Sequence, residues 1–364
     1  MSDQSHGDRR PAPTLPLDVL VLILSYLPRS DTATLSAFLR SSKLCYTAAA
    51  PLLYRHLHFG SPTDLHHFVG LQKASKRGQA NTISRPGQGR RPPKVSNTRK
   101  KDLLKSVRTL SIKAHNDWWC NGLPELSFPN LHTLRLDLSR ESPNLIHSKD
   151  QRQSCVTFRT VSPKRLVLRS LQPWPGLSPP FAPYADLIQR TTDDLVLVLG
   201  ELGQPWHPAL PSLLSKSLRP LSSCPAKRIS IIFWTESPHI RCLRGLDSSS
   251  QRWPNLAGDF LLPFAKWALT EPRKLVMVNT GSFAFLRKST AAAEEAVQEA
   301  VEQQLKDGIP NTIFEGYPGG QVEKERLRDV EFMTMKKYLE ETDWAGVFDE
   351  KEVRPWLQVS EAEG

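Results

Sequence analysis

The chain has 364 residues, 39% of them hydrophobic, and its 48 Lys plus Arg exceed its 37 Asp plus Glu, which gives a formal charge of +11. At roughly 150 residues per domain, this length predicts two domains, and the lack of any apolar run of about 18 residues excludes a membrane span. Five widely spaced cysteines without a CxxC pair favour reduced thiols in a cytoplasmic or nuclear protein.

Three short helices are predicted between residues 15 and 60. Pro16 suits a first helical position, and Asp18 lies in the first turn, at the positive end of the helix dipole. Asp31 is placed to cap a second helix, and Ser41 or Ser42 opens a third. We therefore expect a helical module over residues 12–60, preceded by a disordered N-terminus over residues 1–11.

This module carries more apolar surface than its own core can bury. Three helices in fewer than 50 residues enclose little volume, and the first has apolar residues around more than half of its circumference. An ordinary amphipathic helix bundle is one interpretation. The excess of apolar residues favours the other interpretation, a docking surface for a partner.

An ordered set of motifs marks the module: Leu15-Pro16-x-Asp18-Val19-Leu20, then Ile23, Tyr26-Leu27-Pro28, Asp31, Leu35 and the closing Ala50-Pro51-Leu52-Leu53-Tyr54. In these motifs it resembles the F-box of fungal-type F-box proteins, through which receptor subunits bind the adaptor of cullin-based ubiquitin ligases. Phe38-Leu39-Arg40 and Tyr46 stand where that family often has Val-Cys-Lys and Trp. The resemblance implies that seven residues contact the adaptor: Leu15, Pro16, Leu20, Ile23, Leu27, Leu35 and Leu39.

Four histidines follow, His56, His58, His66 and His67, and raise the question of a metal site. The first two alternate with apolar residues, which is typical of a half-exposed strand, and no cysteine or carboxylate pair completes a ligand set. We predict a strand here and neither a metal ion nor any other cofactor.

A basic segment separates the module from the rest of the chain. Between Lys73 and Lys105 there are eleven basic residues and one acidic residue, a net charge of +10. With few apolar side chains, residues 61–106 are predicted to be a disordered, solvated linker. The alternatives are a nuclear-import signal and phosphate contacts, both of which involve Arg90, Arg91, Lys94, Arg99, Lys100 and Lys101. No aromatic residues interleave these charges, so nucleic acid is the least favoured partner.

The pattern apolar-x-x-apolar-x-apolar recurs through the central region. Clear copies end in Leu110-Ser-Ile112, Leu134-Arg-Leu136 and Leu166-Val-Leu168, and looser copies end in Leu195-Val-Leu197, Ile229-Ser-Ile231 and Leu275-Val-Met277. Each copy predicts a short strand, and the 24–46 residues between their starts leave room for a return to a neighbouring parallel strand.

These copies resemble leucine-rich repeats, although most spacings exceed the usual length and the characteristic Asn or Cys is absent. We therefore predict, over residues 107–285, an irregular α/β solenoid with parallel strands; an open parallel α/β sheet is the competing architecture. Tryptophans including Trp234 are interpreted either as core or as part of a recognition surface.

The C-terminal region, residues 286–364, is acidic and is predicted to be a helical cap on the end of the solenoid. One helix is expected over residues 290–306 and another from near Gln321, with Val330 and Tyr338 on its apolar side. Trp344, Val347, Phe348 and Trp356 are expected to be buried. The acidity is interpreted as a solvated face, with attraction of the basic linker or a basic partner as the alternative.

No catalytic motif occurs in the chain, neither a phosphate-binding loop, nor GxSxG, HExxH or a kinase catalytic loop, so we expect no enzyme activity. The resemblance implies a substrate receptor that binds the ligase adaptor through the module and an unknown protein through the repeats. The alternatives are an interaction scaffold without a ligase and a nuclear nucleic-acid-binding protein.

Overall fold

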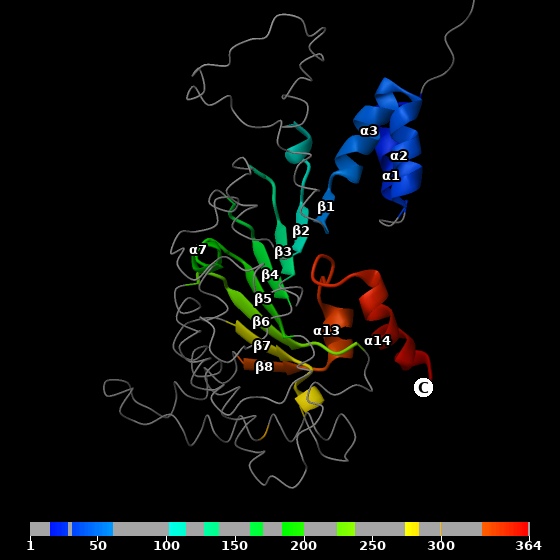
Figure 1. Ribbon diagram of the computed structural model, residues 1–364. Helices are drawn as coiled ribbons and strands as arrows, with labels where there is room; N and C mark the ends of the chain where they lie inside the picture. Colours follow the sequence, from blue (N-terminus) through cyan, green and yellow to red (C-terminus); the bar gives the residue numbers. More distant parts are fainter. Residues whose placement is uncertain are drawn as a thin grey trace, which may run out of the picture.

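A computed structural model describes residues 15–27, 31–60, 102–113, 127–137, 161–169, 184–199, 224–236, 274–283, 299 and 330–362. These residues form three N-terminal helices, an eight-stranded parallel sheet and two C-terminal helices, so the chain belongs to the α/β class (Figure 1). Within the described ranges, no helix has the length and apolar character needed to cross a bilayer.

The three N-terminal helices are α1 (Leu17–Ser25), α2 (Thr32–Ser41) and α3 (Lys43–Leu53). The Asp31 carboxylate caps α2 as predicted and accepts a hydrogen bond from the Thr34 backbone N–H. Of the two serines predicted to open the third helix, Ser42 is the cap, and its hydroxyl accepts from the Cys45 N–H; both bonds are 3.0 Å long. Caps of this kind satisfy backbone donors that the first helical turn leaves unpaired. They explain why the second and third helices begin where the sequence predicts.

The sheet contains eight parallel strands in the order in which they occur in the chain. Six of them are the strands that the repeated pattern predicts, and another is the strand predicted at the alternating histidines. The last was not predicted. In chain order the strands are β1 (His56–Phe59), β2 (Thr109–Lys113), β3 (Thr133–Asp137), β4 (Arg165–Arg169), β5 (Asp194–Leu199), β6 (Arg228–Phe233), β7 (Lys274–Val278) and β8 (Val330–Met333).

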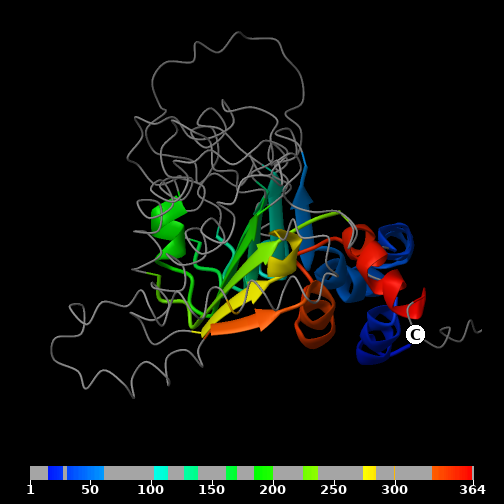
Figure 2. The ribbon, with the colours of Figure 1, turned by 90° about the horizontal axis from the view of Figure 1, so that it is seen from below.

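The apolar residues of the repeats align in register on one face of the sheet. Leu110 pairs with Leu134, which pairs with Leu166, and the row continues across the remaining strands. These leucines are at most 1% exposed. The short helix α7 (Ala185–Ile188) lies on this side, opposite to the C-terminal helices (Figures 1 and 2). Burial of this face therefore holds the strands in their register.

Three predicted boundaries differ from the structure. Residues 56–59 were assigned to the helical module but form the first strand of the sheet. Residues 102–104 were assigned to the disordered linker but form a helical turn with a buried Leu104. Residues 330–333 were expected in a helix but form β8. The sheet thus extends one strand beyond the predicted repeat domain at each end.

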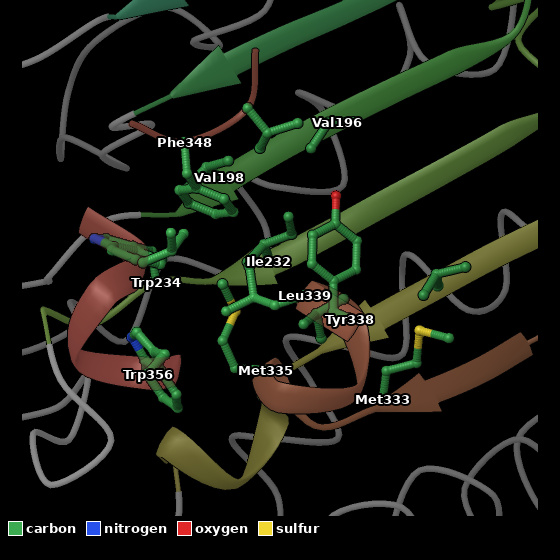
Figure 3. Packing of buried hydrophobic residues seen from close by; sticks show 14 of the residues in the cluster. Val196, Val198, Ile232, Trp234, Met333, Met335, Tyr338, Leu339, Phe348 and Trp356 are labelled. Carbon is green, nitrogen blue, oxygen red and sulfur yellow. The ribbon is translucent and has the colours of Figure 1, made fainter. Parts of the chain in front are cut away.

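The opposite face of the sheet is covered by α13 (Met335–Glu341) and α14 (Glu350–Ala362). Side chains from these helices and from the loop between them pack on β4 to β8, as Figure 3 shows for Tyr338, Phe348 and Trp356. The expected burial of Val347, Phe348 and Trp356 is confirmed, and Trp344 is partly buried. The C-terminal segment therefore covers a face of the sheet, where the sequence predicts a cap at the end of the domain.

Gly346, in the loop between α13 and α14, has φ of +86°. A Cβ atom there would lie 3.2 Å from the Cγ2 atoms of both Thr109 and Thr133. We expect Gly346→Ala to lower the free energy of unfolding by about 1–2 kcal/mol, because the alanine is strained at positive φ and also crowds the sheet. Urea denaturation measures the change.

Gly60→Ala is the matched control for this substitution. Gly60 has no positive φ, and among the described residues a Cβ atom there would approach only the imidazole ring of the exposed His58, at 3.3 Å. This side chain can move, so we expect a change below about 0.5 kcal/mol. Equal effects of the two substitutions would show that the loop does not depend on the glycine.

Candidate functional site

Helix α1 exposes more large apolar side chains than any other described element. Of its residues and those that flank it, the exposed fraction is 53% for Leu15, 56% for Leu22, 50% for Ile23 and 82% for Tyr26. Leu17 and Val21 are about two-fifths exposed. Most exposed apolar residues in proteins are scattered singly, whereas a group on one helix marks an interaction surface. We call these six residues, together with Pro16, the α1 surface.

The α1 surface is distinct from the core of the module. That core consists of Leu20, Leu24, Leu35, Ala48 and Ala49, all at most 7% exposed. Because α1 already buries Leu20 and Leu24 against α3 and α2, the exposed residues on its other sides are not needed to close the module. They remain available to a partner.

The seven residues predicted to contact an adaptor therefore fall into three groups. Leu15, Pro16 and Ile23 are exposed and belong to the α1 surface. Leu20 and Leu35 are buried and stabilise the module itself. Leu27 and Leu39 are partly buried against the core. Leu17, Val21, Leu22 and Tyr26 also belong to the α1 surface but are not among the seven. The signal for them in the sequence was the apolar character of the whole helix.

The other predicted sites have limited structural counterparts. The six basic residues from Arg90 to Lys101 lie outside the described residues, as do His66, His67 and the helix predicted over residues 290–306, apart from residue 299. His56 and His58 are exposed on β1, and within the described ranges no cluster of three potential metal ligands occurs. Trp234 is 8% exposed and belongs to the core beneath the C-terminal helices.

A face of the sheet would be the expected binding surface of a repeat domain, but the C-terminal segment occupies one face here. The ring of Phe348 stacks on that of Trp234 with a centroid distance of 4.3 Å. The indole Nε1 of Trp356 donates a hydrogen bond of 3.2 Å to the carbonyl of Thr235. Figure 3 shows the rings of Trp234, Phe348 and Trp356 close to one another near α14.

Two arginines on this face are paired with carboxylates of the C-terminal segment. Arg135 donates to both oxygens of Asp349, at 2.8 and 3.2 Å, and Arg169 donates to both oxygens of Glu352, at 2.9 and 2.7 Å. Both arginine side chains are only 6% exposed. Paired guanidinium groups of this kind fix the position of the segment through their two-pronged geometry.

The ion pair also affects the titration of Asp349. Partial burial by itself raises the pKa of this carboxyl, but the hydrogen bonds and the charge of Arg135, with the charges of Arg169 and His58, outweigh burial, and the pKa lies below its usual value. The carboxylate form is therefore favoured by the fold. Part of the acidity of this region, interpreted from the sequence as a solvated face, serves to bind the sheet.

Comparisons of the chain with protein-family models, with curated proteins and with solved structures found no match.

Proposed function

We propose that the chain is a non-catalytic substrate receptor of a cullin-based ubiquitin ligase. In this proposal the α1 surface binds the adaptor subunit, and the sheet domain binds a protein target that other subunits modify. The supporting observation is that α1 exposes Leu15, Leu22, Ile23 and Tyr26 although the module closes its core without them. An apolar surface on a folded helix favours a protein partner.

For the sheet domain we propose an irregular solenoid of leucine-rich-repeat type. The supporting observations are the strand order, which follows the chain from β1 to β8 without reversal, and the buried leucine rows in register across the strands. Doubly wound α/β sheets reverse their strand order at a switch point. A monotonic order is instead what stacked repeats produce.

The proposed site of action is the cytoplasm or the nucleus, where cullin-based ligases work. The chemistry of the proposal requires no catalytic residue, metal ion or cofactor in this chain, because the ubiquitin transfer belongs to other subunits. Its requirements are two separate binding surfaces and a rigid connection between them. The run of α3 into β1, with only Tyr54 and Arg55 between them, supplies a short connection.

The double substitution Leu15→Ala/Ile23→Ala tests the proposal. Full burial of a large apolar side chain contributes about 1.5–3 kcal/mol, so the loss of two half-exposed anchors is expected to cost about 2–3 kcal/mol, or roughly 100-fold in affinity for the adaptor. Calorimetric titration of the purified full chain with the adaptor measures this change. Both side chains are exposed, so the thermal stability should stay unchanged.

Leu357→Ala provides the control, because Leu357 is 43% exposed but lies on α14. We expect its adaptor affinity to match that of the unaltered chain. Undiminished binding by the double variant would refute the docking surface. If the unaltered chain fails to bind the adaptor at all, the ligase proposal fails and the alternative of an interaction scaffold takes its place.

A further inference from the structure

The residues that directly precede the strands form a continuous row along one edge of the sheet. The carbonyl of Arg55 accepts hydrogen bonds from the backbone N–H groups of Arg108, at 2.9 Å, and Thr109, and the carbonyl of Arg108 accepts from His132 at 2.8 Å. In the same way, the carbonyl of His132 accepts from the residue after Lys164. We call Arg55, Arg108, His132 and Lys164 the amino-edge row, because they lie at the amino ends of β1 to β4.

The side chains of the amino-edge row are exposed, and those of Arg55, Arg108 and Lys164 carry positive charges. Among the described residues, no carboxylate forms an ion pair with Arg55, Arg108 or Lys164; the Arg108 guanidinium makes a single long contact of 3.4 Å with the carbonyl of Asn130. The arginines on the face of the sheet, such as Arg135, are in contrast already paired. The amino-edge row therefore offers cationic side chains that the described part of the fold does not neutralise.

The edge that carries the amino-edge row is a better candidate for a binding surface than the face of the sheet, because the C-terminal segment covers that face. To reach that face, a ligand would have to displace Phe348, Val353 and Trp356, each buried to 8% exposure or less. This displacement would expose the apolar surface of all three side chains to water before any contact with the ligand formed. The amino-edge row is already exposed.

We propose that the amino-edge row binds a short acidic segment of a protein. Four neighbouring strands at about 4.8 Å spacing extend over about 14 Å, the length of roughly four extended residues. Beyond Lys164 the next position is Asp193, which forms an ion pair with Lys227 at 3.4 Å and ends the run of basic residues. In length and charge, the row thus suits a peptide of about four residues that carries several carboxylate side chains, either consecutive or alternating.

The same observations disfavour a nucleic acid. A phosphate backbone needs a longer cationic track, and single strands gain much of their affinity from bases stacked on aromatic rings. The aromatic residues nearest to the row in the sequence are Tyr54, which is partly buried, and Phe128, which is buried. The assignment of the acidic segment to the target protein rests on the proposed receptor function.

Fluorescence anisotropy with the purified full chain and a labelled peptide of about six glutamates, somewhat longer than the row, tests the proposal. The variant Arg55→Ala/Arg108→Ala/Lys164→Ala is expected to bind at least about tenfold more weakly, because three charge-assisted contacts are lost. The matched control is Lys336→Ala/Lys351→Ala/Arg354→Ala, which removes the same charge from exposed positions on α13 and α14. Its affinity should stay within about twofold of the unaltered chain.

The basic segment before Lys105 is the same in all three proteins, so its attraction for the peptide cancels in the comparison. Equal weakening in both triple variants, or no binding by the unaltered chain, would overturn the proposal. So would tighter binding of an oligothymidine of about fifteen nucleotides, lost in the same row variant. The adaptor is absent from this assay, and the Leu15→Ala/Ile23→Ala variant should bind the peptide normally, so this proposal and the docking proposal fail independently.

Discussion

Trp356→Ala is expected to lower the free energy of unfolding by about 3–5 kcal/mol. The Trp356 ring is 8% exposed and lies 6.4 Å from the ring of Trp234, centroid to centroid, on the covered face of the sheet. Alanine would leave a cavity there and remove the hydrogen bond from the indole to the Thr235 carbonyl. Urea denaturation followed by tryptophan fluorescence and circular dichroism measures the loss.

Leu357→Ala serves as the control, because Leu357 follows Trp356 directly on α14 and is 43% exposed. We expect a change below about 1 kcal/mol for this variant. If Trp356→Ala destabilises the protein no more than the control does, then α14 is only loosely held. In that case the covered face of the sheet would be accessible to a ligand, and the energetic argument for the amino-edge row would lose its basis.

The sequence predicted the positions of seven strands but not the eighth strand, β8. All six repeats found in the sequence form strands at the expected residues, because burial of the alternate positions leaves a strong local pattern. The same pattern is present in Leu327-x-x-Val330-x-Phe332, and β8 pairs Val330 with Leu275 in the register of the other strands. It was missed because apolar residues three apart also fit one face of a helix.

The closure of the sheet face could not be read from the sequence. Arg135 and Asp349 are separated by 214 residues, and Arg169 and Glu352 by 183. Charge composition showed a basic and an acidic region, but charge alone does not specify which residues meet. Likewise, the apolar excess on the first helix predicted a docking surface, while the division between exposed Ile23 and buried Leu20 depends on how α1 packs against α2 and α3.

The pair formed by Arg169 and Glu352 should respond unequally to loss of either partner. The Arg169 side chain is 6% exposed and the Glu352 side chain 30%, so the arginine depends more on its partner for compensation of its charge. We expect Glu352→Ala to cost about 3 kcal/mol, since it leaves a buried guanidinium without its carboxylate. It also removes the acceptor for the backbone N–H of Asp349, a bond of 2.7 Å at the start of α14.

Arg169→Met should cost less, about 1–2 kcal/mol, because Glu352 can still be hydrated and remains 3.8 Å from Arg135. Urea denaturation of both single variants and of the double variant forms a thermodynamic cycle. The double variant should lose less stability than the sum of the two single losses. In it, methionine replaces the guanidinium that Glu352→Ala alone leaves buried without its carboxylate. Additive losses would contradict a direct pair. A larger loss for Arg169→Met than for Glu352→Ala would mean that the stem of the arginine and its guanidinium, 5.3 Å from the centroid of the Phe348 ring, contribute more through packing than through the ion pair.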